Sequence, residues 1–507
     1  MKIIFIIFFV LFPTTLIYSK TADIIKNKEE VFEPYKCNEL KTEFLRNNES
    51  NSCFIIQKLS NVYEVKSNDF DKNTWQSPQI IKYLNNNDGG KIITHSWNNV
   101  VKWGEESNKQ PISHLVILHV DDLNSLFSSK SEIKSNHLTL PLSLRRVNVL
   151  DTNNDGNEEI VYLSNREDGR NRNSSWRDVN YIFDLKSNTL TKFGSSQFSH
   201  DLMYLDLDND GYLEILDYYY GDKKPAAIEV CEVRTNKCKV SKDAGKFIDI
   251  GFNHLIKSKN GSIIFGGCPN LGNTTFCWAE IEYKKRKLKF KKLASYEFKK
   301  KPKDEADFLI WTGDVQNKPG YWVDGSDKKQ FKMADRSWIS ATIDFNSDGF
   351  TDSIAIEKNV LCLRENPKLP FNRSGGDCKD EAFMYIFKNN NDLSFEKHQI
   401  IPTTINDSFR IEKADVNKDG TLDVYGFVQG YPNPWMNCKR EQLKSVYLNR
   451  NGEYFEKTSS KFIKDNFGMY GCERASNFFE KDGSYYRLFI TMPSSEANEA
   501  YLGIEKY

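Results

Sequence analysis

Carboxylate and carboxamide side chains recur at fixed spacing in four segments of the sequence. Each segment follows the pattern D-x-[DN]-x-D-G-x-x-[DE], and the four begin at Asp151, Asp206, Asp344 and Asp415. When such a loop curls, the side chains at positions 1, 3 and 5 converge, and glycine at position 6 permits the sharp turn. Calcium binds about six to eight hard oxygen ligands of this kind. The repeat therefore predicts up to four calcium sites.

Each loop offers five ligands, which are the side chains at positions 1, 3, 5 and 9 and the carbonyl oxygen of position 7. The predicted ligands are Asp151, Asn153, Asp155, Asn157 and Glu159 in the first loop; Asp206, Asp208, Asp210, Tyr212 and Glu214 in the second; Asp344, Asn346, Asp348, Phe350 and Asp352 in the third; and Asp415, Asn417, Asp419, Thr421 and Asp423 in the fourth. The second loop carries four carboxylates, so we expect it to bind calcium more tightly than the others.

The residues around these loops exclude an EF-hand. That motif needs glutamate at position 12 and a helix on each side. Position 12 is Tyr162, Asp217, Ala355 or Gly426 in the four segments. The flanking runs are short and rich in β-branched and aromatic residues, which is typical of strands. Each loop is therefore expected to connect two strands.

The succession of strand, acidic loop and strand resembles the FG-GAP/VCBS repeat family, the calcium-loop β-propeller repeats that also occur in integrin α subunits. Two hairpins strengthen the resemblance, because residues 385–395 and 446–455 place an Asn-Asp or Asn-Gly turn before an aromatic residue. The resemblance covers roughly residues 75 to 507. It implies an all-β fold, a β-propeller of four-stranded blades in which the calcium ions are structural.

Units laid end to end along the chain give seven blades. Those with acidic loops begin near Arg146, His200, Trp338 and Arg410, and weaker units lie at 80–94, 249–265 and 477–491. The segment 307–325 is either an insertion, which we favour, or an eighth, degenerate blade. The last unit has three strands, so a strand at about residues 52–60 is expected to complete its sheet and close the ring.

The N-terminal residues predict export. Lys2 precedes an apolar run from Ile3 to Ile17, and the small residue Ser19 follows. This pattern predicts a secretory signal peptide over residues 1–19, since a membrane span needs about 20 apolar residues; an uncleaved anchor is the alternative. A polar, extended N-terminal arm over 20–50 and the propeller over 51–507 would follow. We expect a secreted, periplasmic or cell-surface protein with no membrane span after cleavage.

Ten cysteines fit an exported protein. None has the CxxC or Cys/His spacing of a zinc site, and an even number predicts disulfide bonds, with buried free thiols as the alternative. Connectivity is not fixed by the sequence. Pairing of neighbours in the sequence would join Cys37 to Cys53, Cys231 to Cys238, Cys268 to Cys277, Cys362 to Cys378 and Cys438 to Cys472.

The loops from the second to the third strand of each blade would emerge opposite the calcium loops. In the integrin-like propellers that this chain resembles, that face contacts ligands. Here these loops are rich in arginine, tyrosine and tryptophan, which are enriched at interfaces and which also stack on sugars. The ligand-face candidates are Arg170, Arg172, Trp176, Arg177, Tyr219, Trp278, Tyr431, Trp435 and Arg474.

These observations predict a calcium-stabilised binding or adhesion module for an extracellular or periplasmic protein or a glycan. Nucleic acid is not expected as a partner, because 70 Lys and Arg residues balance 70 Asp and Glu residues. We assign no catalytic residue, since the sequence lacks the G-x-S-x-G, H-E-x-x-H, P-loop and Rossmann motifs. His114 and His119 are five residues apart on an expected strand and so point to opposite faces.

Two alternatives remain open. Some polysaccharide lyases use calcium-loop propellers, so an extracellular polysaccharide-degrading enzyme on the same scaffold is one. A structural subunit of a surface assembly is the other. The fold alone does not decide among them.

Overall fold

In the computed structural model, the described part of the chain is built almost entirely from β-strands. The structure describes residues 26–40, 52–59, 78–86, 89–98, 112–120, 122–128, 131–140, 144–164, 180–194, 199–221, 224–241, 254–267, 275–297, 309–311, 321–324, 330–364, 378–390, 394–403, 409–428, 446–458, 462, 472–492 and 500–507. Within these residues, two short 3-10 helices, η1 (Cys37–Glu39) and η3 (Leu123–Phe127), accompany the strands. None of the helices described is long and apolar enough to cross a membrane.

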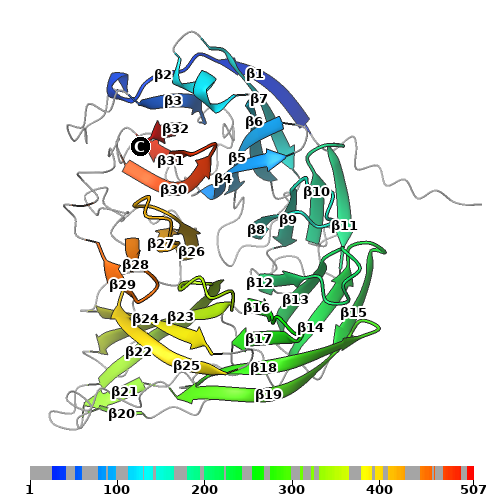
Figure 1. Ribbon diagram of the computed structural model, residues 1–507, viewed down its shortest axis with the longest axis vertical. Helices are drawn as coiled ribbons and strands as arrows, with labels where there is room; N and C mark the ends of the chain where they lie inside the picture. Colours follow the sequence, from blue (N-terminus) through cyan, green and yellow to red (C-terminus); the bar gives the residue numbers. More distant parts are fainter. Residues whose placement is uncertain are drawn as a thin grey trace, which may run out of the picture.

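The strands form seven antiparallel sheets, the blades of a β-propeller (Figure 1). Blade 1 contains β4 (Pro78–Asn86), β5 (Gly89–Asn98), β6 (Ile112–Val120) and β7 (Ile133–Leu140); blade 2 contains β8 (Leu144–Leu150), β9 (Glu159–Ser164), β10 (Asn180–Asp184) and β11 (Thr189–Phe193); blade 3 contains β12 (Ser199–Leu205), β13 (Glu214–Gly221), β14 (Lys224–Glu232) and β15 (Lys237–Ser241). Blade 4 contains β16 (His254–Lys257), β17 (Ile263–Gly267), β18 (Thr275–Lys284) and β19 (Lys287–Glu297); blade 5 contains β22 (Gln330–Ile343), β23 (Asp352–Arg364), β24 (Cys378–Asn389) and β25 (Phe395–Pro402). Blade 6 contains β26 (Phe409–Ala414), β27 (Asp423–Val428), β28 (Val446–Arg450) and β29 (Tyr454–Lys457); blade 7 contains β30 (Cys472–Lys481), β31 (Ser484–Met492), β32 (Tyr501–Lys506) and β3 (Cys53–Lys58).

The first strand of each blade lies innermost, and the predicted seven-bladed ring is confirmed. Neighbouring inner strands contact one another in the order β4, β8, β12, β16, β22, β26 and β30, and β30 returns to β4. Each middle strand is therefore covered by another blade on both faces. In β9, for example, Ile160 and Tyr162 pack in one interblade cluster while Val161 and Leu163 pack in another. This explains why such strands read as continuous apolar runs rather than as alternating ones.

The segment that offered an eighth blade is an addition to blade 5. β20 (Leu309–Trp311) and β21 (Tyr321–Asp324) extend the sheet in the order β20-β21-β22. β21 pairs with β22 over Gln330–Lys332, at the start of that long strand. The hairpin therefore belongs to an existing sheet.

Residues from the expected N-terminal arm pair with two blades. β1 (Lys26–Phe32) runs antiparallel to β7 along the outer edge of blade 1, and β2 (Tyr35–Lys36) pairs with β3. β3 in turn pairs with β32. An outer strand leaves backbone N–H and C=O groups without partners, and added strands satisfy them. The segment from β1 to β3 thus spans the junction between blades 1 and 7.

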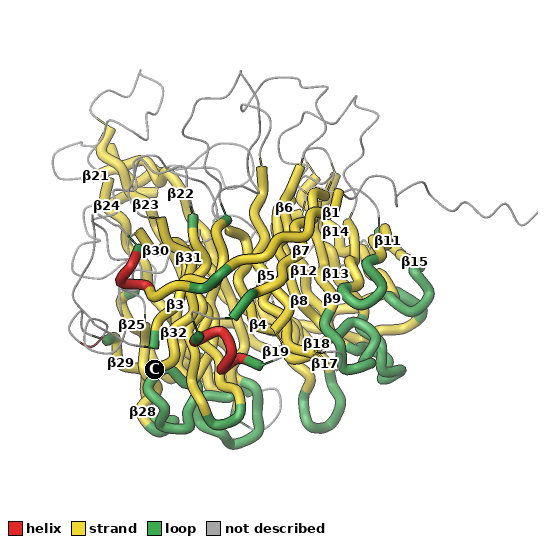
Figure 2. Tube along the Cα trace, turned by 90° about the horizontal axis from the view of Figure 1, so that it is seen from above, coloured by secondary structure: helices red, strands yellow, loops and turns green. Residues whose placement is uncertain are grey.

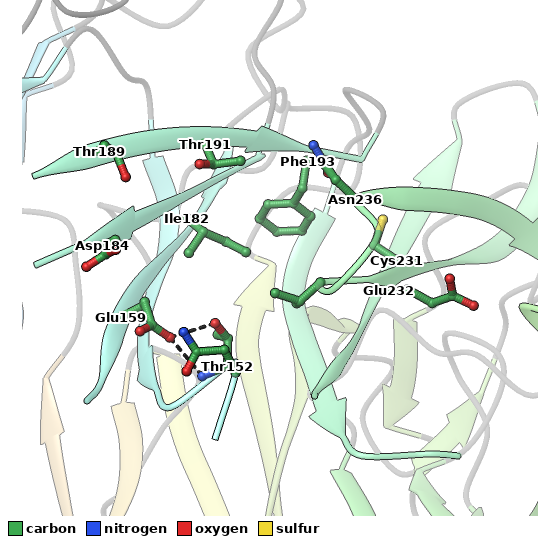
Figure 3. Close-up of a pocket in the computed structure, with 12 residues that line it drawn as sticks. Thr152, Glu159, Ile182, Asp184, Thr189, Thr191, Phe193, Cys231, Glu232 and Asn236 are labelled. Atoms are coloured by element: carbon green, nitrogen blue, oxygen red, sulfur yellow. Dashed lines mark hydrogen bonds between the residues drawn. The ribbon is translucent and has the colours of Figure 1, made fainter. Parts of the chain in front are cut away.

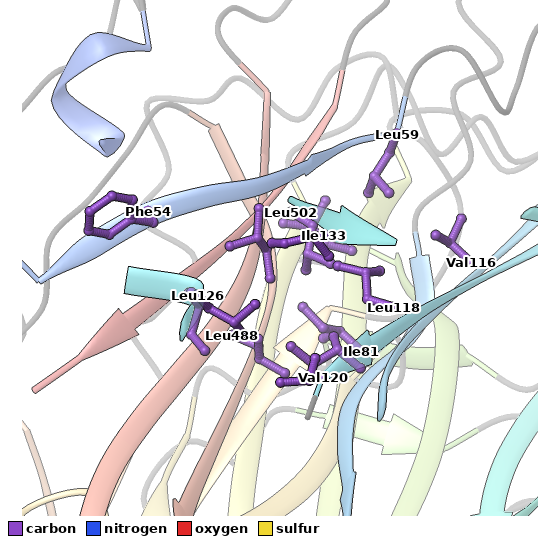
Figure 4. Packing of buried hydrophobic residues seen from close by; sticks show 14 of the residues in the cluster. Phe54, Leu59, Ile81, Val116, Leu118, Val120, Leu126, Ile133, Leu488 and Leu502 are labelled. Carbon is purple, nitrogen blue, oxygen red and sulfur yellow. The ribbon is translucent and has the colours of Figure 1, made fainter. Parts of the chain in front are cut away.

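Apolar packing holds that junction together (Figure 4). Phe54 and Leu502 of blade 7 lie in one buried cluster with Ile81 and Val116 of blade 1, and Leu126 of η3 joins them. All five residues are at most 6% exposed. The ring is therefore closed by core contacts as well as by the pairing of β3 with β32.

Candidate calcium loops

All four acidic loops connect the first strand of a blade to the second. Loop 1 (151–159) follows β8, loop 2 (206–214) follows β12, loop 3 (344–352) follows β22 and loop 4 (415–423) follows β26. Blades 2, 3, 5 and 6 therefore carry one loop each. Because the inner strands run in the same sense around the ring, the loops share one face, where Figure 2 shows described turns gathered.

The four loops have the same backbone conformation. Two residues of each loop lie in the left-handed region, with φ of 54° to 65° at position 4 (Asn154, Asn209, Ser347 and Lys418) and 79° to 88° at position 6 (Gly156, Gly211, Gly349 and Gly420). The glycine N–H in each loop donates to the position-1 carboxylate, at 2.9 to 3.2 Å. A side chain at position 6 would be strained, since this region favours glycine. The sequence repeat is thus a structural repeat.

Loop 2 concentrates negative charge most strongly. Carboxylate oxygens of Asp206, Asp208 and Asp210 all lie within 4.8 Å of one another. Burial, together with the charges of Asp210 and Asp206, raises the pKa of Asp208. Arg234 from the turn after β14 approaches Asp210, with Nη1 3.2 Å from Oδ2. Mutual repulsion of the three carboxylates would be relieved by a cation among them.

The position-9 carboxylates are buried beneath the loops. Glu159, Glu214, Asp352 and Asp423 are at most 4% exposed. Each accepts the backbone N–H of position 2, at 2.7 to 3.1 Å. Burial is the main cause that raises the pKa of Glu214 to about 7 and of Asp352 and Asp423 to about 6.

The oxygen donors fit calcium. In loop 3, Oδ1 of Asp344 is buried and has no hydrogen-bond partner in the described structure. A buried carboxylate oxygen without a partner is unfavourable unless a cation or donor reaches it. In loops 1, 3 and 4 Nδ2 of the position-3 asparagine donates to the position-5 carboxylate, at 3.4, 2.8 and 2.7 Å, which holds these two predicted ligands side by side. Carboxylate and amide oxygens of this kind are hard ligands.

A cavity of about 190 Å³ adjoins loop 1 between blades 2 and 3 (Figure 3). Thr152 and Glu159 line it from the loop, Ile182 and Phe193 from the outer strands of blade 2, and Glu232 from blade 3. Pockets for drug-sized ligands have volumes of about 300–1,000 Å³. The cavity is therefore too small to be a polysaccharide cleft.

Most ligand-face candidates lie outside the described residues, namely Arg170, Arg172, Trp176, Arg177, Tyr431 and Trp435. Tyr219 lies in β13, where its backbone pairs with Ser199 and Ala227. Arg474 lies in β30 at a register shift between Glu473 and Ala475. The backbones of these two residues are thus part of sheets rather than of loops.

Trp278 is not part of an exposed ligand face, and the prediction for this residue is wrong. It is 1% exposed, in the packing between blades 4 and 5. Its ring stacks on Phe395 with centroids 4.6 Å apart, and its Nε1–H donates to Oγ of Ser353 at 3.1 Å. Nε2 of His254 lies 2.9 Å from the same hydroxyl oxygen. Trp278 therefore joins two blades.

The sequence alone did not indicate that three buried histidines lie together in blade 1. His114 is buried and His119 exposed, as predicted for opposite faces of β6. The neighbouring strands add His95 and His137, which are 0% and 4% exposed. Nε2 of His137 lies 2.9 Å from Oγ of Ser135 and 3.4 Å from a carboxylate oxygen of Glu30 in β1. The strand register that gathers these residues has no signature in the sequence alone.

Two predicted disulfides are confirmed, between Cys37 and Cys53 and between Cys231 and Cys238. Cys277 is also disulfide-bonded, and Cys362 lies opposite Cys378 in the register of β23 and β24. Cys472 begins β30. Cys268 and Cys438 lie outside the described residues.

Comparison with known proteins shows likeness of shape only. No protein-family model matches the chain, and no curated protein matches it. Among solved structures, the polysaccharide lyase Uly1 is similar over 92% of this chain and 99% of its own, at 10% identity and a TM-score of 0.34. PorZ, a bacterial surface component of the type-IX secretion system of Porphyromonas gingivalis, is similar over 82% of this chain and 62% of its own, at 10% identity and a TM-score of 0.21. At these values neither carries an argument about activity.

Proposed function

We propose that this chain is an exported β-propeller, stabilised by calcium, that binds an extracellular or periplasmic protein or a glycan through the face opposite the acidic loops. The observation that carries the proposal is the repetition of one loop geometry in blades 2, 3, 5 and 6. An ordinary turn needs neither converging carboxylates nor a buried acid at position 9. Secreted proteins are exposed to millimolar calcium, a concentration at which even weak sites of this type are occupied.

The loops are placed to stabilise contacts between blades. Lys82 of blade 1 reaches Glu158 in loop 1, with Nζ 2.9 Å from Oε1. Lys257 of blade 4 donates to the carbonyl oxygen of Asp206 in loop 2 at 3.3 Å, and Lys259 donates to that of Asp348 in loop 3 at 3.0 Å. Bound calcium would supply positive charge and fixed coordination within each loop. Ordering the loops would therefore also order the neighbouring blades.

A rigid ring is what a binding face needs. Loops that hold a ligand lose less entropy on binding when their scaffold is already fixed. Export is supported by the two confirmed disulfides, which persist in oxidising compartments. The formal charge balance supports a protein or a glycan as the main partner rather than nucleic acid.

Two measurements test the proposal. Isothermal titration of the metal-free chain with calcium should show saturable binding at up to four sites, and magnesium should compete weakly because it prefers strict octahedral geometry. A glycan array and an extracellular-protein panel, each probed with calcium and with EDTA, should show calcium-dependent capture. Absence of saturable calcium binding would refute the calcium part, and absence of capture in calcium would refute the binding part.

A further inference from the structure

Positive charge is concentrated on one hairpin at the outer edge of blade 4. Between residues 280 and 291 there are six basic and two acidic side chains, a surplus of four positive charges in a chain whose total charge is zero. The basic residues are Lys284, Lys285, Arg286, Lys287, Lys289 and Lys291. β19 is the outermost strand of its sheet. The hairpin therefore presents an electropositive edge.

Alternation along β19 places three lysines in one row. Leu288 is 1% exposed and packs with Phe290 in the core between blades 3 and 4. Lys287, Lys289 and Lys291 therefore point to the other side of the strand. Residues two apart on a strand are separated by about 6.7 Å, so the row has regular spacing.

Neighbouring acids only partly compensate these charges. Nζ of Lys289 lies 3.7 Å from Glu282 and Nζ of Lys291 lies 3.8 Å from Glu280, and the two lysine side chains are 75% and 78% exposed. Exposed ion pairs at such distances contribute little. Lys284 lies directly opposite Lys287, where like charges destabilise a sheet.

The turn at the tip is also unfavourable for its residues. Lys285 and Arg286 adopt φ of 52° and 58°. Two-residue hairpin turns of this kind favour Asn-Gly, because bulky side chains are disfavoured at positive φ. Elsewhere this chain uses Asn451-Gly452 and Asp482-Gly483 at such turns. The two charged residues at the tip thus lower the local stability of the hairpin. Such an unfavourable local conformation indicates a function.

We propose that residues 284–291 form a binding site for a linear acidic polysaccharide, one whose sugar units carry carboxylate or sulfate groups. A single row of evenly spaced cations matches a chain of evenly spaced anions. Basic residues alone attract anionic lipids, but membrane binding is strengthened by apolar side chains that insert between lipids, and the exposed large hydrophobic residues of the described structure all lie outside this hairpin. The site is separate from the acidic loops and goes beyond the function proposed above.

The hairpin is held in place by blade 3. Arg286 Nη1 lies 3.3 Å from a carboxylate oxygen of Glu232 in β14, and Tyr283 donates to the other oxygen at 3.3 Å. β19 also contacts β15 of that blade. The row of lysines is therefore fixed before a ligand arrives, which favours binding of an extended chain.

The test compares matched charge-removal variants of the full chain. Binding is measured with heparin, which is sulfated, and with polygalacturonate, which is carboxylated, at about 0.1 M salt. The variant K287Q/K289Q/K291Q should bind at least about tenfold more weakly than wild type. The control K134Q/K186Q/K457Q removes three exposed lysines from other blades and should stay within about twofold of wild type.

A second variant separates charge from folding. K285N places a residue that tolerates positive φ at the turn and removes one charge while keeping the Arg286 contact with Glu232, so it should hold or raise the melting temperature and still weaken polysaccharide binding. The triple arginine variant K287R/K289R/K291R should keep wild-type affinity. These outcomes cannot arise from loss of structure.

Three results would overturn the proposal. Wild type could fail to bind either polysaccharide, the control could lose as much affinity as K287Q/K289Q/K291Q, or phosphatidylserine vesicles could be bound in a hairpin-dependent way while both polysaccharides are not. Because none of these readouts requires the acidic loops, their failure is distinguishable from failure of the calcium-dependent function.

Discussion

The carboxylate of Glu214 accepts a hydrogen bond of 2.7 Å from the backbone N–H of Leu207. The two residues stand at positions 9 and 2 of loop 2, and Glu214 is 1% exposed. This carboxylate therefore ties the two ends of the loop together through the protein's own hydrogen bond. Position 9 thus has a structural role in addition to the role of calcium ligand that the repeat predicts.

Replacing position 9 and replacing position 3 should have different effects. Glu214→Ala leaves the N–H of Leu207 buried without an acceptor, so it should lower the free energy of unfolding in EDTA by about 1–3 kcal/mol. Asp208→Ala should leave stability in EDTA unchanged or slightly raised, because it relieves repulsion, and should reduce calcium affinity. Denaturant unfolding with and without calcium measures both. Glu132→Gln, an exposed acid on blade 1, is the control, and equal behaviour of Asp208→Ala and the control would contradict the loop 2 site.

Calcium should raise the melting temperature of the whole ring. At a free concentration of about 100 times Kd, one site stabilises the folded state by about 2.7 kcal/mol. With up to four loops, we expect a rise of about 5 °C or more that EDTA reverses. Differential scanning calorimetry measures this, and an unchanged melting temperature would mean that the loops act as ordinary turns.

The buried histidines of blade 1 predict acid sensitivity. Burial is the main cause that lowers the pKa of His95 from 6.5 to about 3 and of His114 to about 4. At these two histidines the unfolded chain binds more protons than the folded one below pH 6.5, so their contribution to stability is complete above pH 6.5 and is lost as the pH falls toward 3 to 4. The buried position-9 acids, whose pKa values are raised, act in the opposite direction. His95→Phe should make stability depend less on pH, because the histidine ring, whose centroid lies 5.3 Å from that of Tyr162, is replaced by a ring that does not titrate. Melting curves from pH 4 to 8 would show it, and the exposed His119→Phe should leave the slope as in wild type.

Gly503 is required for packing in the closing blade. A Cβ atom there would lie 2.2 Å from Cζ of Phe489. Gly503→Ala should therefore destabilise the protein by about 1–3 kcal/mol. The double variant G503A/F489L should recover part of the loss because it removes the ring. Equal stability of the two variants in urea unfolding would show that the blade relaxes in another way.

The disulfide between Cys37 and Cys53 should stabilise the junction of blades 1 and 7. It closes a loop with a sequence separation of 16, for which loop entropy gives about 3 kcal/mol. The variant C37S/C53S should unfold at lower denaturant, and limited proteolysis should cut first near its N-terminal segment. A variant that matches wild type in both assays would place the strength of the junction in its apolar core alone.

The sequence predicts the parts of this fold that repeat. Each acidic loop needs its residue types at fixed spacing, so four copies identify both the strands around them and the blade period. Trp278 was misassigned because it was expected in a loop, whereas it lies inside β18, whose two faces are both covered by neighbouring blades. The polar segment 26–32 gave no apolar signal for a strand, since β1 is added through backbone pairing with β7. The gathering of His95, His114 and His137 depends on register, which no local pattern sets.

The pairing of β3 with β32 also bears on how the chain reaches its folded state. Ser52 Oγ donates to the carbonyl oxygen of Lys506 at 2.7 Å, across 454 residues of sequence. Closing so long a loop adds little to the entropic cost, because that cost grows only with the logarithm of length. It does affect rate, since folding slows as contacts become more distant in sequence. Blade 7 is therefore expected to form last, with the edges of β3 and β32 exposed to self-association until they meet.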